Sequence, residues 1–495
     1  MADDGVEAAI LAEEAFADSG ALPSWSASGR WLAYYARRSP ESAERHLWVR
    51  RHDAGNPTAG WREPVLASAG QWRALGYGGI TPSPTRDQFL LGKNDGGAQA
   101  IIAVVTPHED GTVDVHELHH LTNGDDLVPT GQVLGAWTPD GARVVLIIKE
   151  KDVSDRLVVH DIHPSGNAPP SSARDLLAPA GTSFGLPWLM LRERLSADGR
   201  WISLDMQRDA GGQPGLAAVP LDGGGAAREV PGCAVGRESG APSCAAGEWH
   251  PTRSMQIVRR GPIDALEIVV WDPDAGVLAT VPAFEGHWLG HSARMLVRPD
   301  RTSRRLGVVD VDVDAPTPAI TFVDGTDLPS FLRASASPDG RWLLLEHYDR
   351  KATWLEIVDL DAAPPWARRE VVRTPFGQPR FNFEHWSPPG GTTLLLASRD
   401  LPRGDERAVD RAISVDLPTA KAIAIEVRHA APADGARQPV WSWANRSAPA
   451  GDSIVLARDG QLAVWRVGAP LTELVTLPDT SEWATVVWRP ALPSP

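Results

Sequence analysis

The sequence lacks any apolar run that approaches membrane-spanning length, and its first residues lack the positive charge and apolar core of a secretory signal. It is also poor in basic residues: it has 48 Lys and Arg but 63 Asp and Glu, which gives a formal net charge of −15. A protein that binds nucleic acids or anionic lipid surfaces needs positive charge. We therefore expect an acidic, soluble chain that binds neither nucleic acid nor membrane, with the cytoplasm as its default location.

Cysteine is scarce as well. The chain has only Cys233 and Cys244, which could close a loop between two of the repeats described below. In a reducing compartment such a pair stays reduced. We therefore predict free thiols rather than a disulfide.

A short turn phrase, in contrast, is abundant. Its fullest form is Ser337-Pro338-Asp339-Gly340-Arg341-Trp342. These residues suit a tight reversal between antiparallel strands, with Ser first, Pro with its preset φ next, Asp to bond nearby amides and Gly to tolerate positive φ. Looser copies of the phrase begin near Trp25, Ser83, Trp137, Leu195, Trp249, Trp386 and Asn445.

The spacing of these turns predicts four short strands in each repeat. Counted at residues 26, 83, 138, 196 and 250, successive turns are 57, 55, 58 and 54 residues apart. In the third repeat we expect strands at 132–137, 143–148, 156–162 and 174–177. The stretch from Pro251 to Ser337 is long enough for two repeats, which brings the number of repeats to nine, with eight as the alternative.

Repeated sheets without long helical segments predict radial closure, since an open sheet of so many strands would leave long unpaired edges. We therefore predict an all-β fold, a single β-propeller of eight or nine four-stranded blades across residues 22–490. Residues 1–21, which include the Ala- and Glu-rich segment Val6–Phe16, would form a short N-terminal helical extension. Residues 491–495 would form a C-terminal tail.

The turn phrases at Trp25, Trp137, Leu195, Ser337 and Trp386 resemble the WD40-like β-propeller repeats of the TolB type. They are also similar to the N-terminal propellers of the prolyl oligopeptidase and dipeptidyl peptidase families. The resemblance covers nearly the whole chain. In those peptidases it implies a propeller that gates a separate α/β-hydrolase domain with a Ser, Asp and His triad, and this chain resembles the propeller without that domain.

One string, Gly181-Thr182-Ser183-Phe184-Gly185, matches the G-x-S-x-G pattern of a hydrolase nucleophile. Such a nucleophile needs a strand before it and a helix after it. The segment Leu186–Leu191 leads instead into the next turn as a strand. We therefore do not expect Ser183 to be catalytic.

Histidines near the inner strands are the candidate catalytic groups. His250 and His385 each adjoin a turn tryptophan, and His291 completes the spacing His287-x-x-x-His291. On a strand this last pair would be about 13 Å apart, too far for one zinc ion, and we predict no metal and no cofactor. Hydrogen-bonded core histidines are the competing interpretation of His250 and His385. The arginines that could stabilise an anion beside these histidines are Arg192, Arg194 and Arg380.

Tryptophan is unusually frequent, with 20 residues against 4 tyrosines. The tryptophans that flank the turns recur with the repeat and would wedge between blades. Those outside the pattern are free to stack on sugars, flat compounds or cations, or to anchor a protein interface. Four of them are our candidate ligand-binding residues: Trp188, Trp288, Trp441 and Trp443.

Two functions from different classes agree with these features. The first is a stand-alone, non-hydrolytic propeller that binds a protein, peptide or small-molecule ligand at its axial channel or top face. The second is a propeller enzyme of the lyase, cyclase or hydrolase type, with a His and Arg site at the channel mouth and with or without a metal. Binding is favoured, because the spacing reveals no constellation of acid, base and electrophile.

Overall fold

The computed structural model describes the chain in segments that cover most of its repeats. The described residues are 23–37, 45–52, 65–68, 72–73, 80–94, 99–122, 132–149, 156–163, 173–176, 178, 182–185, 191–208, 215–233, 243–262, 265–301, 305–312, 317–323, 331–349, 352–375, 383–400, 409–428, 453–458 and 461–476.

The chain divides into two compact units. The larger consists of Gly20–Asp53 and Trp61–Thr321, and the described part of the smaller begins at Phe322 and ends at Thr476. We call them the N-terminal unit and the C-terminal unit.

Six consecutive sheets begin in the N-terminal unit. Their strands are β1 (Ser24–Trp25), β2 (Trp31–Arg37), β3 (Arg45–Arg51) and β4 (Val65–Ser68); β5 (Trp72–Arg73), β6 (Thr81–Pro82), β7 (Phe89–Asn94), β8 (Gln99–Pro107) and β9 (Val113–Thr122); β10 (Gln132–Trp137), β11 (Arg143–Lys149), β12 (Arg156–Asp161) and β13 (Arg174–Leu176); β14 (Thr182–Gly185), β15 (Trp201–Arg208), β16 (Gly215–Pro220) and β17 (Arg228–Glu229); β18 (Ser243–Trp249), β19 (Gln256–Gly261), β20 (Glu267–Asp272) and β21 (Gly276–Val281); and β22 (Glu285–Trp288), β23 (Arg294–Arg298), β24 (Gly307–Asp310) and β25 (Thr321–Phe322). A 3-10 helix, η1 (Leu191–Arg194), precedes β15.

Three more sheets belong to the C-terminal unit. Their strands are β26 (Phe331–Ala336), β27 (Trp342–Tyr348), β28 (Ala352–Asp359) and β29 (Arg368–Pro375); β30 (Phe383–Trp386), β31 (Thr393–Asp400), β32 (Val409–Asp416) and β33 (Lys421–Arg428); and β34 (Ser453–Arg458), β35 (Gln461–Arg466) and β36 (Thr472–Thr476).

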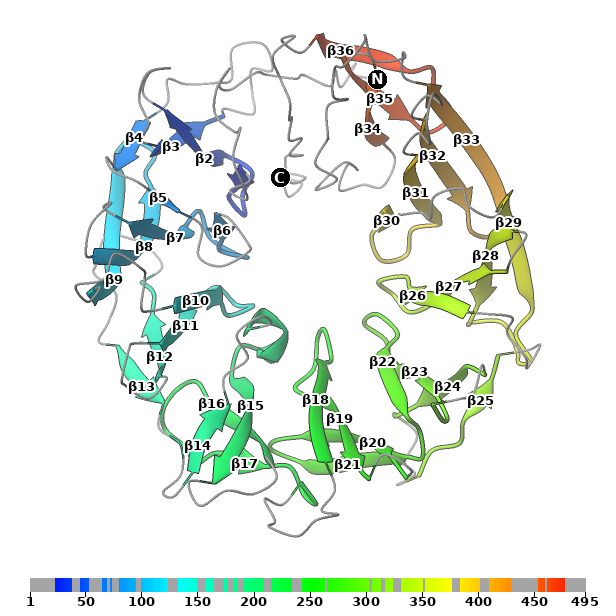
Figure 1. Ribbon diagram of the computed structural model, residues 1–495, viewed down its shortest axis with the longest axis horizontal. Coiled ribbons are helices and arrows are strands. Elements are labelled where there is room, and N and C mark those ends of the chain that lie inside the picture. Colours follow the sequence, from blue (N-terminus) through cyan, green and yellow to red (C-terminus); the bar gives the residue numbers. More distant parts are fainter. Residues whose placement is uncertain are drawn as a thin grey trace. The chain divides into compact units, whose positions relative to one another are not determined.

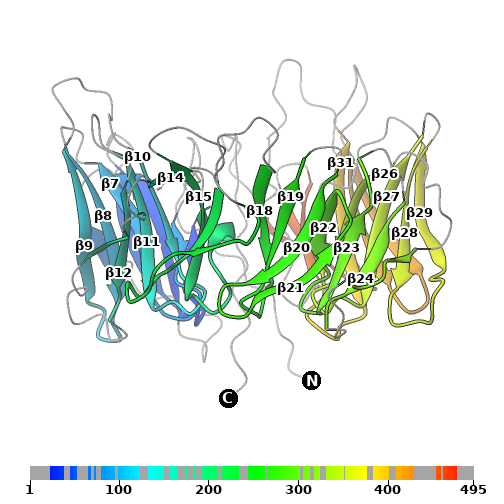
Figure 2. The ribbon, with the colours of Figure 1, turned by 90° about the horizontal axis from the view of Figure 1, so that it is seen from below.

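Every sheet is an antiparallel meander in which a strand pairs with the next one along the chain, except that β5 and β6 both pair with β7. Across the described residues there are nine sheets, seven of four strands, one of five and one of three. The chain is a β-propeller. In the N-terminal unit the first strands β10, β18 and β22 lie on the inner side of their sheets (Figure 1), and the strands run between the same two sides of the unit (Figure 2).

These sheets confirm the predicted fold class and its strand pattern. In the third repeat the observed strands β10 to β13 begin at the predicted residues and end within one residue of the predicted ends. The extra length between Pro251 and Ser337 is accounted for by the sixth sheet, so that nine blades are observed. The predicted extension at 1–21 and tail at 491–495 lie outside the described residues.

The turn between the first two strands of a sheet is held by the residues that predicted it. In the fourth sheet Ser196 N donates to Trp201 O (3.0 Å) and Gly199 N donates to Ser196 O (2.9 Å). The Ser196 hydroxyl accepts from Trp201 N (2.9 Å) and donates to Asp198 Oδ1 (2.6 Å). Gly199 has a φ of 68°, which L side chains rarely adopt. The same side-chain bonds recur in the turn at Ser337–Trp342.

The sixth turn has the same backbone geometry with different residues. Leu289 N donates to Arg294 O (2.9 Å) and Ser292 N donates to Leu289 O (3.2 Å), as in the Ser-x-Asp-Gly turns. His291 therefore stands where the Ser-x-Asp-Gly turns have aspartate, and Trp288 stands where Trp25, Trp137, Trp249 and Trp386 precede their turns. This turn carries no Ser-x-Asp-Gly phrase, so the repeat was visible in the sequence only as extra length.

Successive turns are hydrogen-bonded to one another within each unit. These bonds connect six pairs of neighbouring sheets through residues in or next to their turns, and a polar turn residue supplies the donor or the acceptor. They are Ser28 Oγ to Asp87 Oδ2 (2.8 Å), Thr85 Oγ1 to Asp140 O (2.9 Å), Arg143 Nη1 to Gly199 O (3.2 Å), Ser254 Oγ to Asp198 Oδ2, His250 Nε2 to Ser292 O (3.1 Å) and, in the C-terminal unit, Gly390 N to Asp339 Oδ2 (3.2 Å).

Tryptophans that precede a turn join neighbouring sheets in a second way. Three of them bury the ring and donate the indole N–H to a backbone carbonyl of the preceding repeat, as a buried Trp requires. The three such bonds among the described residues are Trp137 Nε1 to Thr81 O (3.1 Å), Trp249 Nε1 to Arg194 O (2.8 Å) and Trp288 Nε1 to Glu248 O (3.2 Å).

Within a unit, a sheet that lies between two others buries both of its faces against them, as the third sheet does. On β11, Val144 and Leu146 pack with the second sheet, whereas Val145 and Ile147 pack with Leu204 of the fourth. This division follows from the period-2 alternation of a strand. The apolar runs of the sequence are therefore long because both faces of the strand are covered.

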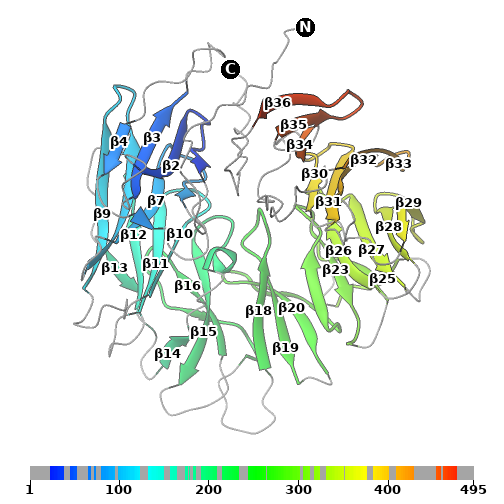
Figure 3. The ribbon, with the colours of Figure 1, turned by 45° about the horizontal axis from the view of Figure 1, so that its top comes forward.

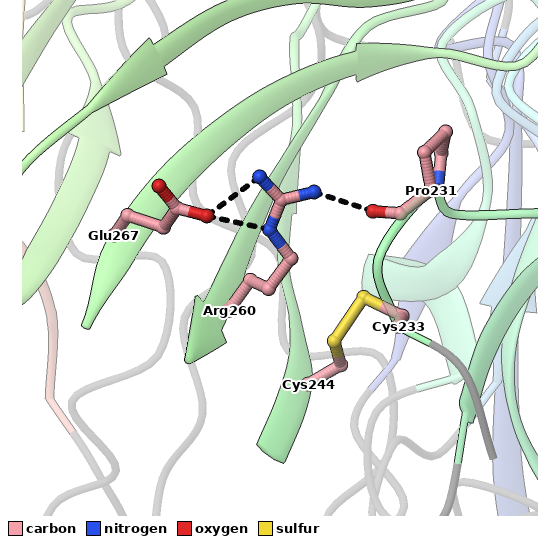
Figure 4. The surroundings of a disulfide bond; sticks show 5 residues. All are labelled: Pro231, Cys233, Cys244, Arg260 and Glu267. Carbon is pink, nitrogen blue, oxygen red and sulfur yellow. Dashed lines mark hydrogen bonds and ion pairs between the residues drawn. A yellow bond between two sulfur atoms is a disulfide. The ribbon is translucent and has the colours of Figure 1, made fainter. Parts of the chain in front are cut away.

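The prediction of free thiols is wrong, because Cys233 and Cys244 form a disulfide. Cys233 follows β17 at the end of the fourth sheet, and Cys244 lies in β18, the first strand of the fifth. This crossing between sheets places their Cα atoms 5.6 Å apart, within disulfide range. Figure 4 shows the bond beside Pro231, Arg260 and Glu267.

Candidate functional site

Charged side chains on the first strands of the fifth and sixth sheets form the most prominent polar group of the N-terminal unit. His287 Nδ1 lies 2.8 Å from Glu248 Oε1, and its Nε2 lies 3.6 Å from Glu285 Oε1. Arg298 Nη2 pairs with the other oxygen of Glu285 at 2.6 Å. We call Glu248, Glu285, His287 and Arg298 the charged cluster.

The strand pattern explains how the charged cluster is displayed. Glu285 and His287 alternate along β22 and so share one face, and Arg298 is the register partner of Glu285 on β23. On the opposite face Trp288 packs into the core and Gly286 lies against Ile268. The charged cluster is accordingly open to solvent, with the His287 side chain 52% exposed.

The two carboxylates keep His287 protonated. Hydrogen bonds to Glu248 and then to Glu285 raise the pKa of His287 to about 10, against a smaller opposing effect of burial. The bond from His287 also lowers the pKa of Glu285. At neutral pH the charged cluster therefore contains two carboxylates, an imidazolium and a guanidinium, and His287 is no general base.

His250 is a core residue that joins two turns. It is fully buried, its Nδ1 accepts from Thr252 N (3.1 Å) and its Nε2 donates to Ser292 O (3.1 Å). Its ring meets that of Trp288 edge to face at 4.7 Å between centroids. Burial, first among several effects, lowers the pKa of His250, so the ring is neutral and both of its nitrogens are engaged.

The other predicted catalytic residues are dispersed. His291 is exposed at the tip of the sixth turn, and Arg192 is exposed on η1. His385 is half-buried on β30 in the C-terminal unit. Arg380 lies outside the described residues. His250 is hydrogen-bonded to Ser292, the residue that follows His291, and His291 is close enough to add to the effect of burial in lowering the pKa of His250.

Of the predicted ligand-binding tryptophans, only Trp288 is described. It is buried, its indole N–H bonds to Glu248 O, and its backbone N–H donates to Glu248 Oε2 (3.3 Å). Trp288 thus supports the charged cluster from the core side. Trp188, Trp441 and Trp443 lie outside the described residues.

A partly buried acid lies beside the 3-10 helix. Asp205, on β15, is 3.8 Å from Arg194 Nη1. Burial raises the pKa of Asp205, while the charge of Arg194 opposes the rise. η1 adjoins the first strands β10 and β18 on the inner side of the N-terminal unit (Figure 3), so this pair lies near the same side as the charged cluster.

A second polar group occurs in the C-terminal unit, where His347 is fully buried on β27. Its Nε2 lies 3.0 Å from Glu356 Oε2, which also pairs with Arg368 (3.1 Å). The ring stacks on Trp354 at 5.2 Å between centroids. These contacts hold three strands of one sheet together, and they have the form of a structural network.

Within the described residues, no three His, Cys, Asp or Glu side chains are arranged to hold a metal ion. Ser183 lies on β14, a strand, so its surroundings there are not those of a hydrolase nucleophile. No helix in the part of the chain that the structure covers is long and apolar enough to cross a membrane.

In the sequence His287 stood out only as the first residue of the His287-x-x-x-His291 spacing. Its partners Glu248 and Glu285 were not predicted. The alternation of Glu285 and His287 could have placed these two on one face of a strand. Glu248 is 39 residues from His287 and meets it only because adjacent sheets align their first strands.

No protein-family model matches the sequence, and the search of curated proteins found no significant relative. Among solved structures, a eukaryotic initiation factor is similar over 84% of this chain and 89% of that one, with 10% identity and a TM-score of 0.45. A prolyl endopeptidase matches 79% of this chain and 55% of its own, with 14% identity and a TM-score of 0.37. Prolyl oligopeptidase B from Galerina marginata matches 80% and 55%, with 10% identity and a TM-score of 0.36.

Prolyl oligopeptidases, which the turn phrases resemble, are thus among the structural matches. The chain spans 55% of the length of both peptidases. At such identities the likeness concerns the fold alone.

Proposed function

We propose that this chain is a binding propeller that holds a protein, peptide or small-molecule ligand without hydrolysing it. The surface that we assign to binding is the inner side of the N-terminal unit, where first strands of neighbouring sheets adjoin. Connecting loops and inner strands of a repeat fold commonly carry its function.

The charged cluster is the observation that supports this proposal. It presents two carboxylates beside two cations on an exposed surface, which suits orientation of a polar ligand. Its histidine is held protonated, and His250 of the neighbouring turn is buried and fully bonded. Acid–base catalysis needs a group that exchanges its proton near the working pH, and neither residue offers one.

A test uses a displayed random peptide library selected on the full chain. We expect selected peptides whose binding weakens at least 10-fold in the double variant Glu248→Gln, Glu285→Gln. The matched control is Glu426→Gln, since Glu426 is also exposed and also pairs with an arginine, Arg411, but lies on β33. The selected peptides are also incubated with the chain and analysed by mass spectrometry. Peptides that remain intact would agree with a non-hydrolytic role. Equal binding by both variants, or cleavage of the peptide, would contradict the proposal.

The alternative, a propeller enzyme, has one observation in its favour. A carboxyl group with a raised pKa beside an arginine is common at catalytic sites, and Asp205 with Arg194 has that arrangement. If a substrate screen found turnover, loss of activity in Asp205→Asn and retention in Asp222→Asn would favour this alternative.

The cytoplasmic location stays a prediction from composition. The disulfide between Cys233 and Cys244 counts against it, because such bonds are rare in reducing compartments.

A further inference from the structure

The disulfide is a cross-link between two sheets. Cys233 is fixed to the fourth sheet, since its N–H donates to Val230 O (3.1 Å) and Val230 N donates to Leu216 O (2.9 Å) on β16. Cys244 belongs to the fifth sheet, where it is the register partner of Arg260 on β19. The bond therefore ties the end of one blade to the inner strand of the next.

The same two segments are also joined without the sulfur atoms. Arg260 Nη1 donates to Pro231 O (2.5 Å), and its Nε donates to Glu267 Oε1 (2.7 Å), which fixes the guanidinium (Figure 4). Gly232, with a φ of 76°, lets the chain pass this side chain, because a Cβ there would lie 2.7 Å from Arg260 Nη1. These contacts align the two cysteines independently of the disulfide.

The bond is also shielded on the side of Cys233, whereas Cys244 is partly exposed. Cys233 is 3% exposed and packs with Trp201, Trp249 and Trp271. A thiol that reduces a disulfide must reach one of its sulfur atoms. Attack at Cys233 therefore requires the fourth and fifth sheets to separate, which would expose three tryptophans.

We propose that this disulfide is a permanent structural bond between the fourth and fifth sheets, and that the chain folds in an oxidising compartment. When the disulfide forms, the two thiols lose two protons and two electrons and form one S–S bond. The electrons pass to a protein disulfide of an oxidising thiol–disulfide exchange system, which becomes a dithiol. The chain has no third cysteine, so no other pairing within it competes.

The redox state in the native cells tests the compartment. Cells are quenched in acid, free thiols are alkylated, and the full-length chain is digested and analysed by mass spectrometry. We expect a linked peptide pair that contains Cys233 and Cys244, with no alkylated form of either. Recovery of both cysteines in alkylated form would overturn the proposal.

Thermal unfolding of the full chain tests the structural role. Closing a short loop in the unfolded chain raises stability enough to shift the midpoint by several degrees. We expect the double variant Cys233→Ala, Cys244→Ser to unfold several degrees lower, and reduced wild-type protein to match it. Reductant should leave the variant unchanged, which controls for other effects. A midpoint of oxidised wild-type protein equal to that of the variant would show that the bond has no structural role.

Discussion

Ser254 Oγ donates a hydrogen bond to Asp198 Oδ2, and through this bond the turn of one sheet holds the turn of the next. Asp198 also accepts from Ser196 Oγ (2.6 Å) and from Arg200 N (3.1 Å) within its own turn. Although burial opposes it, these bonds lower the pKa of Asp198. One carboxylate thus serves both the local turn and the contact between sheets.

We expect Asp198→Ala to destabilise the protein by about 1–2 kcal/mol, because it removes hydrogen bonds to a charged acceptor. The matched control is Asp222→Ala, since Asp222 also accepts from a nearby amide, Gly224 N (3.0 Å), in an exposed loop. The midpoint of thermal unfolding measures both. An effect no larger than that of the control would show that the bond between turns adds nothing to stability.

Trp249 gives a second prediction, because it combines a buried ring with a hydrogen bond to Arg194 O (2.8 Å). Trp249→Phe keeps most of the apolar surface and should cost about 1 kcal/mol. Trp249→Ala leaves a cavity between the fourth and fifth sheets and should cost roughly 3–5 kcal/mol. Chemical denaturation compares the two, and similar losses from both would contradict a role for the indole N–H.

His287 should stay protonated far above the usual range of histidine. Its pKa is raised to about 10, so its ion pairs are fully formed below pH 6.5 and are lost as the pH rises through about 10. NMR titration of the ring protons should show no transition between pH 5 and 9. Glu248→Gln should move the transition toward neutral pH, whereas Glu117→Gln, which removes the partner of His120, should not.

His160 predicts the opposite pH dependence. It is 3% exposed on β12, and burial followed by the nearby His119 lowers its pKa to about 4. Because the unfolded chain binds this proton near pH 6.5, stability is present above that pH and falls as the pH decreases toward 4, by up to roughly 3 kcal/mol. His160→Phe should flatten this part of the stability profile, and the exposed His163→Gln should leave it unchanged.

The features that could be predicted from the sequence are those that depend on residues close together in the chain. A turn such as Ser196–Gly199 carries its own bonding partners, so its position and the flanking strands followed from the phrase itself. The sixth turn was missed because Leu289 and His291 reach the same backbone geometry without the Ser and Asp side-chain bonds. Trp288 was then placed outside the repeat, although it behaves as the other turn tryptophans do.

The features that escaped prediction depend on how sheets adjoin. The charged cluster unites Glu248 with residues of the next sheet, and no local pattern records that meeting. The disulfide was set aside because composition suggested a reducing compartment, whereas the decisive fact is the alignment of Cys233 with Cys244 by Arg260. The sequence of one repeat does not show which of its side chains come close to those of the next repeat.

Because a sheet that lies between two others within a unit covers both of its faces with them, half a blade has no stable partner for its remaining side chains. Whole repeats, in contrast, bring a matching tryptophan, a matching turn and two matching apolar faces. Gene duplication or loss that respects these boundaries would preserve every junction, which makes the complete repeat the natural step by which such a chain lengthens or shortens.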